Sequence, residues 1–128
     1  MSDCCYMSVT CRKQDAKRFE DIGFEEIDEE ETPKGILVEM EDEQANAAHY
    51  GKLPIDIPYY GFSGSGGDYG PSLFACDGKK YIEINCNEYR EPMVPIMITR
   101  TEATIAADVM EDAREYGRLL ATVQEILG

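Results

Sequence analysis

The stretch that decides the fold is residues 6–40, YMSVTCRKQDAKRFEDIGFEEIDEEETPKGILVEM. Residues 6–11 have the pattern of a short strand. The next residues, 12–22, carry three apolar side chains at helical spacing: Ala16, Phe19 and Ile22. Gly23 follows as the residue that ends a helix, and a second strand begins at Phe24. The sequence therefore predicts the order β-α-β.

The second half of this stretch predicts an acidic β-hairpin. Residues 32–35 form a turn with Pro at its second position and Gly at its fourth, which joins an acidic strand to the apolar residues 36–40. Between residues 20 and 43 there are twelve acidic side chains and one basic side chain, Lys34. Two interpretations are open. The charges either keep a solvated sheet edge from aggregating or form a recognition surface for a basic partner.

A second hairpin is predicted further along the chain. The dipeptide Asp77-Gly78, between strand-like residues 73–76 and 80–86, is the strongest short hairpin signal in the sequence. Residues 93–98 predict one more strand, which Pro95 restricts to an edge or a bulge.

A long helix is predicted to close the chain. Thr99 and Glu102 have capping-box spacing, although Gly117 weakens the helix interior by about 1 kcal/mol. The apolar stripe of this helix has a period near 3.6: Ile105, Val109, Ala113, Leu119, Leu120, Val123 and Ile126.

Between the two hairpins, residues 43–50 predict two helical turns and residues 51–71 a long irregular loop rich in Gly and Pro. Four aromatic residues lie close together in this loop: Tyr59, Tyr60, Phe62 and Tyr69. Two interpretations are again open, because tyrosines fill cores beneath long loops and also supply the contact residues of protein interfaces.

The predicted class is α+β, in one domain over residues 1–128. We expect an antiparallel or mixed sheet, with the long C-terminal helix and a short N-terminal helix packed on one face. The opening β-α-β order is compatible with a ferredoxin-like unit.

The formal charge of −14 disfavours two classes of partner. Phosphate backbones and anionic lipids bind Lys and Arg, so we expect neither direct nucleic-acid binding nor membrane binding. Two interpretations of a surface of this sign are open: it attracts basic proteins, or it serves only to keep the protein soluble. The five cysteines, without a signal peptide or membrane-spanning run, predict free thiols in a cytoplasmic protein.

Motifs for catalysis are weak. His49 is the only imidazole in the chain, and no G-x-S-x-G elbow accompanies the serines and aspartates that follow it. The glycine-rich residues 61–67 lack the Gly-Lys-Ser/Thr ending of a phosphate loop. We therefore predict no catalytic residue.

Motifs for metal binding are equally weak. Six side chains have the chemistry of zinc ligands but not the spacing of a readable site: Cys4, Cys5, Cys11, His49, Cys76 and Cys86. Residues 28–31 lack the alternating oxygen ligands and central Gly of a calcium loop. The sequence therefore predicts neither a metal site nor a cofactor.

One resemblance concerns about a third of the chain. It rests on residues 43–54 (EQANAAHYGKLP), 58–61 (PYYG), 68–70 (DYG) and 74–79 (FACDGK). These segments resemble a pattern in uncharacterised small acidic proteins of phages and mobile elements. The resemblance implies a setting like that of anti-defence inhibitors, including anti-CRISPR proteins that occupy nucleic-acid-binding surfaces.

Our leading hypothesis is a non-enzymatic interaction protein that binds a basic nucleic-acid-binding or defence protein. Six carboxylates of the hairpin would steer the partner: Glu25, Glu26, Asp28, Glu29, Glu30 and Glu31. The aromatic contact would come from Tyr59, Tyr60, Phe62 and Tyr69. One alternative is a small enzyme or ligand-binding domain with a site under the loop of residues 51–71 that uses His49. A third hypothesis is a homodimer paired through the closing helix.

Overall fold

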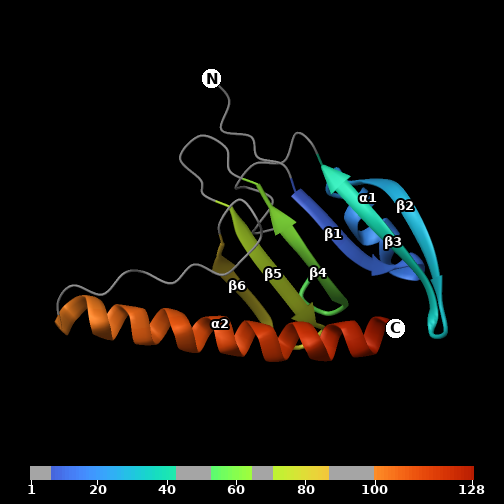
Figure 1. Cartoon of the computed structure of the whole chain (residues 1–128). Coiled ribbons are helices and arrows are strands. Elements are labelled where there is room, and N and C mark those ends of the chain that lie inside the picture. The colour runs from blue at the N-terminus through green and yellow to red at the C-terminus, as the bar shows by residue number, and fades with distance from the viewer. Residues whose placement is uncertain (1–6, 43–52, 65–70, 87–99) are drawn as a thin grey trace, which may run out of the picture.

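The computed structural model describes residues 7–42, 53–64, 71–86 and 100–128, with side chains in the last range placed from residue 111 onward. The strands are β1 (Met7–Arg12), β2 (Glu25–Thr32), β3 (Gly35–Asp42), β4 (Pro58–Ser63), β5 (Ser72–Asp77) and β6 (Tyr81–Asn85). The helices are a 3-10 turn, η1 (Lys13–Asp15), the short α1 (Ala16–Glu20) and the long α2 (Arg100–Leu127). Figure 1 shows the sheet from β6 to β2, with α2 running along it.

The strands form a six-stranded sheet in the order β2-β3-β1-β4-β5-β6, and every neighbouring pair is antiparallel. The α+β class and the antiparallel sheet are thereby confirmed. Strands β1 and β2 run in the same direction with β3 between them, so η1 and α1 form the crossover that a parallel pair requires. The first four strands have the order of a ferredoxin-like sheet.

The predicted first helix is shorter than residues 12–22. It consists of η1 and α1, after which Gly23 adopts φ 109° and the amide of Phe24 donates to the carbonyl of Phe19 at 3.0 Å. This left-handed Gly lets the chain reverse directly into β2. The β2–β3 turn, the β5–β6 hairpin with Gly78 at φ 97°, and the closing helix all form as predicted.

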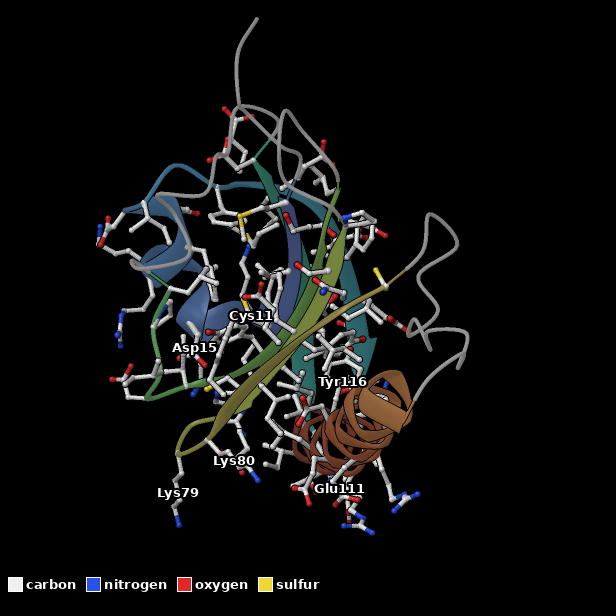
Figure 2. The ribbon with its side chains drawn as sticks, turned by 90° about the vertical axis from the view of Figure 1, so that its left-hand side faces the viewer. Cys11, Asp15, Lys79, Lys80, Glu111 and Tyr116 are labelled. Atoms are coloured by element: carbon white, nitrogen blue, oxygen red, sulfur yellow. The ribbon has the colours of Figure 1, made fainter. Side chains whose placement is uncertain are left out.

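The two helices lie on opposite faces of the sheet, which corrects the expectation that both cover one face. On the α1 face, Phe19 packs with Val9, Met40, Tyr59 and Phe74. The α2 face has a separate cluster that contains Ala75, Ile84, Tyr116, Leu119, Val123 and Leu127. Figure 2 shows Cys11 on the side of α1 and Tyr116 on the side of α2. Successive strand residues point to opposite faces, and here both faces carry apolar residues, so each face needs its own helix.

Strand β4 lies within residues 51–71, where the sequence predicted an irregular loop. It occupies the middle of the sheet between β1 and β5, and Pro58 stands at its first position, where a strand tolerates proline. Gly61 is required there, because an added Cβ would lie 2.1 Å from the carbonyl oxygen of Ser8 and 2.7 Å from the Phe74 ring. The glycine that suggested a loop therefore serves close packing inside the sheet.

Some predictions concern residues outside the described ranges. They are the helical turns at 43–50, the strand at 93–98 with Pro95, and the cap at Thr99. Within the part of the chain that the structure describes, no helix combines the length and apolar character needed to cross a bilayer.

Candidate functional site

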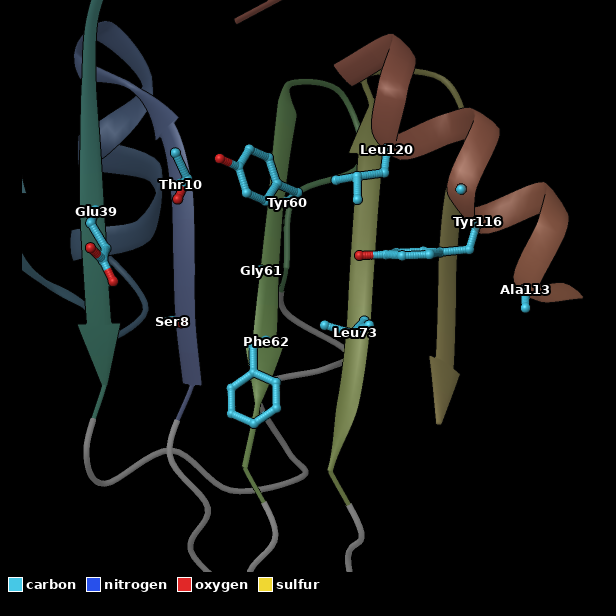
Figure 3. A pocket seen from close by; sticks show the side chains of 11 residues that line it. Ser8, Thr10, Glu39, Tyr60, Gly61, Phe62, Leu73, Ala113, Tyr116 and Leu120 are labelled. Carbon is cyan, nitrogen blue, oxygen red and sulfur yellow. The ribbon is translucent and has the colours of Figure 1, made fainter. Parts of the chain in front are cut away.

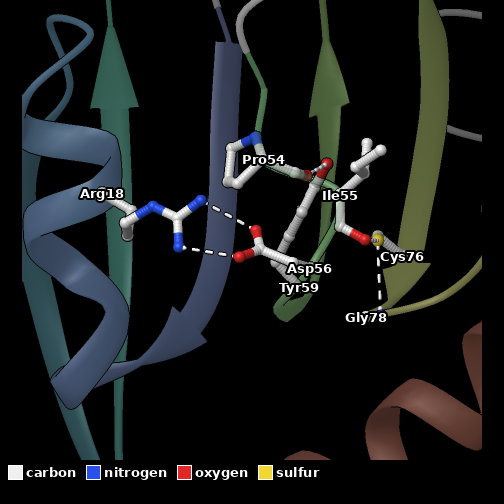
Figure 4. Close-up of polar contacts among 7 residues, drawn as sticks. All are labelled: Arg18, Pro54, Ile55, Asp56, Tyr59, Cys76 and Gly78. Carbon is white, nitrogen blue, oxygen red and sulfur yellow. Dashed lines mark hydrogen bonds and ion pairs between the residues drawn. The ribbon is translucent and has the colours of Figure 1, made fainter.

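The α1 face is closed by the segment that precedes β4. Tyr59 is 0% exposed, and its hydroxyl donates to the carbonyl of Pro54 at 2.6 Å. The thiol of Cys76 contacts the carbonyl of Ile55, and Arg18 holds Asp56 through two hydrogen bonds of 2.7 and 3.1 Å (Figure 4). The guanidinium of Arg18 lowers the pKa of Asp56, and burial raises the pKa of Tyr59 and of Cys76. The α1 face of the sheet is therefore a closed hydrophobic core.

On the α2 face, the side chains change from charged on β2 to apolar on β6. Strand register places two cross-strand rows on it, each running from β2 to β6: Asp28, Glu39, Thr10, Tyr60, Ala75 and Ile82 in one, and Glu25, Glu41, Ser8, Phe62, Leu73 and Ile84 in the other. Directly opposed residues share a face, so each row changes from carboxylate through hydroxyl and aromatic ring to aliphatic side chain. Helix α2 packs on the aliphatic end, over β4, β5 and β6.

We call the charged end of these rows the acidic flank: Glu25, Asp28, Glu30, Glu39 and Glu41. Asp28 faces Glu39 directly, and Glu25 faces Glu41. Like charges directly opposed across two strands are destabilising. Among the residues that the structure describes, no Lys or Arg forms an ion pair with Asp28, Glu30 or Glu39. The flank is therefore a concentration of negative charge that the described chain leaves unneutralised at these three residues.

The α1 side of the same hairpin differs. Glu26 and Glu29 pair with Met40 and Val38, which face α1, and Lys13 lies 2.6 Å from Glu26 and 3.9 Å from Glu29. Glu26 is the main cause that raises the pKa of Lys13. Among the described residues, the ion pairs made by β2 come from Lys13 and lie on the α1 side.

A groove lies between the acidic flank and α2. We call it the aromatic groove: Tyr60, Phe62, Leu73, Tyr116, Gly117 and Leu120, with Ser8 and Thr10 on its floor. Its volume is about 450 Å³, and a smaller hollow of about 230 Å³ reaches from Tyr60 and Thr10 to Asp28 and Glu30. Figure 3 shows Glu39 on β3, Tyr60 and Phe62 on β4, and Tyr116 and Leu120 on α2. Tyr116 is buried, and this burial raises the pKa of its hydroxyl to about 12.

The structure divides the ten residues that the sequence proposed for partner binding. All six carboxylates are exposed on β2, with Glu25, Asp28 and Glu30 in the acidic flank and Glu26, Glu29 and Glu31 on the α1 side. Tyr60 and Phe62 line the aromatic groove. Tyr59 is a correction, because it is fully buried in the α1-side core and presents no surface to a partner. Tyr69 lies outside the described residues.

The sequence analysis missed Glu39 and the walls that α2 provides. Glu39 alternates with Val38 and Met40, whose apolar character marks the α1 face, so strand periodicity alone places it on the α2 face. Tyr116 and Leu127 belong to the buried stripe of α2, together with Leu119 and Val123. Spacing from Leu119 could have identified Tyr116, whereas its position beside Tyr60 depends on the fold.

The other chemical motifs acquire no site in the described residues. Cys11, Cys76 and Cys86 are buried free thiols, and burial raises the pKa of Cys11 to about 12. No group of three potential metal ligands is found among the residues described. His49, Cys4 and Cys5 lie outside those ranges, so the hypothesis of a site that uses His49 stays a prediction.

Comparison of the chain with protein-family models, with curated proteins and with solved structures finds no match. The geometry of the α2 face therefore carries the functional reasoning. It defines an antiparallel α+β protein with a closed core on one face, and an acidic flank beside an aromatic groove on the other.

Proposed function

We propose that this protein is a non-enzymatic interaction protein that binds a basic protein through the acidic flank and the aromatic groove. The observation that carries the proposal is the direct opposition of Asp28 and Glu39 at the edge of an apolar groove. A Lys or Arg that arrives between the two carboxylates removes their repulsion and gains two attractive contacts. The free protein carries this repulsion as a cost in stability. Binding relieves the repulsion, and the relief adds to the free energy of binding.

The aromatic groove supports the same function. Protein interfaces combine a desolvated aromatic centre with a polar rim, and charges at the rim mainly accelerate association. Tyr60, Phe62 and Leu120 are half-buried, Tyr116 lines the groove as a buried residue, and the carboxylates lie to one side. Such a surface fits a partner that presents apolar residues next to Lys and Arg.

We further propose that the partner is a nucleic-acid-binding or defence protein of a host cell. Such proteins carry basic surfaces to bind phosphates, and an acidic flank competes for the same residues. The resemblance to phage and mobile-element proteins favours this inhibitor role. The three buried free thiols, Cys11, Cys76 and Cys86, fit the reducing cytoplasm in which the encounter would occur.

The test compares two variants with the same net charge. One reverses the acidic flank with Asp28→Lys, Glu30→Lys and Glu39→Lys. The control reverses three exposed acids elsewhere, with Glu20→Lys, Asp112→Lys and Glu125→Lys. A basic host protein retained by the wild-type chain is purified, and its association rate is measured at rising salt concentrations.

We expect the flank variant to associate more slowly and with a weaker dependence on salt. The control variant should keep most of the wild-type association rate and most of its salt dependence. Equal slowing by the two variants would mean that net charge alone acts and that this face does not dock a partner. Association that ignores both salt and the flank reversal would refute the proposal.

A further inference from the structure

The two strands that form the floor of the aromatic groove, β1 and β4, are already paired with other strands on both sides. Strand β1 pairs with both β3 and β4, and β4 pairs with both β1 and β5. An extended peptide binds a sheet by adding main-chain hydrogen bonds at an open edge, and none is open at this floor. A segment that lies in the groove must satisfy its own N–H and C=O groups, and a helix does so internally.

The size of the exposed face agrees with one helix. Helix α2 packs over β4, β5 and β6, and only its C-terminal end reaches the β2–β3 turn, where Leu37 packs against the cluster that contains Leu127 and Lys34 donates to the carbonyl of Glu125. Strands β4 and β2 are three strand spacings apart, about 14 Å, and a helix with its side chains is about 10–12 Å across. One helix is therefore wide enough to contact both the aromatic rings of β4 and the carboxylates of β3 and β2.

Gly117 opens the wall of the groove. It lies in the interior of α2, where Gly is the least favourable residue after Pro, and it is exposed. A Cβ added at this position meets nothing within 4 Å, so no neighbour in the described chain requires a glycine. The missing side chain leaves room for a second helix to approach the backbone of α2 closely.

Resting on the proposed function, we infer that the occupant of the groove is an amphipathic basic α-helix of the partner, packed beside α2. Its apolar stripe lies on Tyr60, Phe62 and Leu120, which are half-buried, and Lys or Arg residues on one flank of the stripe reach Glu39 and Asp28. This mode is recognition of a helix in a groove, and Gly117 is its closest point of approach.

The experiment uses two labelled peptides of 18 residues with identical Leu and Lys content. One places Leu at helical spacing, and the other alternates Leu and Lys with the period of a strand. Fluorescence anisotropy measures affinity for the full chain, and circular dichroism measures the helix gained on binding. We expect the helical-period peptide to bind at least tenfold more tightly and to become helical in the complex.

Substitutions in α2 locate the binding. Gly117→Leu fills the groove and should weaken the helical-period peptide at least tenfold. Ala121→Leu, at an exposed position of α2 that does not line the groove, is the matched control and should change affinity less than twofold. Circular dichroism of each free variant verifies that it is folded, which the open space at Gly117 leads us to expect.

The outcomes separate the two proposals. If both peptides bind equally and both are lost in the flank variant with Asp28→Lys, Glu30→Lys and Glu39→Lys, the basic partner stands and the helical mode is overturned. If Gly117→Leu and Ala121→Leu act alike, the groove is not the site of contact and the inference fails. If neither peptide binds, the helical mode is overturned, and the association rates of the host partner judge the proposed function on their own.

Discussion

Neutralising one carboxylate of the acidic flank should stabilise the free protein. In Glu39→Gln the side chain keeps its size while the charge that opposes Asp28 across the β2–β3 pair disappears. Most surface substitutions are neutral or destabilising, so an increase in stability is an unusual expectation. It follows only if Asp28 and Glu39 face one another without a neutralising cation.

The expected gain is about 0.5 kcal/mol at low salt, within the range of about 0.2–1 kcal/mol for a cross-strand pair. Two unit charges about 6 Å apart in water give a similar figure, about 0.7 kcal/mol. For a chain of this size the gain corresponds to a rise in Tm of about 2 °C. In 1 M salt, where the Debye length is about 3 Å, the gain should largely vanish.

Thermal unfolding by circular dichroism at low and high salt measures the effect. Asp28→Asn should give a similar gain, because an amide oxygen can still accept the hydrogen bond from the Glu29 amide at 2.9 Å. The double variant should gain less than the sum, since either change alone removes the repulsion. Glu31→Gln, opposite Ile36, is the control and should have a smaller effect. Equal gains for Glu31→Gln and Glu39→Gln, or a loss in Glu39→Gln at low salt, would refute the reasoning.

Three further predictions concern the core and its edge. Gly61→Ala should cost about 3 kcal/mol in chemical denaturation, because the new Cβ meets the Ser8 carbonyl and the Phe74 ring and neither can withdraw easily. Asp56→Asn should remove a stabilisation that is fully present above the unfolded pKa of about 3.8 and is lost as pH falls through the lower folded pKa; Tm values of the two proteins should therefore converge below pH 3.8. The buried thiols of Cys11 and Cys76 should not react with a thiol reagent in the native protein and should react when the protein unfolds. The absorbance change of the reagent measures both reactions.

Local chemistry explains which elements the sequence predicted correctly. The β2–β3 and β5–β6 hairpins and the closing helix are each marked by residues that few other conformations accommodate. Gly35 and Gly78 adopt positive φ at the two turns, and the α2 residues Leu119 and Val123 are buried as the period of the stripe requires. These features depend on neighbours in sequence, so a single chain contains enough information to predict them.

Strand β4 depends on distant neighbours, and for that reason it was mistaken for part of a loop. Its sequence, PYYGFS, contains a proline and a glycine, which lower the strand propensity of a short segment. What makes it a strand is pairing on both sides, with β1 and β5, and the Phe74 ring that fills the space beside Gly61. Once β4 is recognised, alternation assigns Tyr59 to the core and Tyr60 to the other face.

The acidic hairpin admits a plainer explanation, which is protection of a sheet edge against aggregation. That explanation accounts for the carboxylates of β2, since β2 is an edge strand and charges there oppose pairing with another sheet. It does not account for Glu39, which lies on β3, an interior strand whose backbone is already paired on both sides. An interior strand needs no such protection, and a carboxylate there adds repulsion against Asp28. The placement of Glu39 between Asp28 and the aromatic groove fits recognition of a basic, partly apolar segment, and this supports our proposal that the α2 face binds a partner while the α1 side of β2 protects the edge.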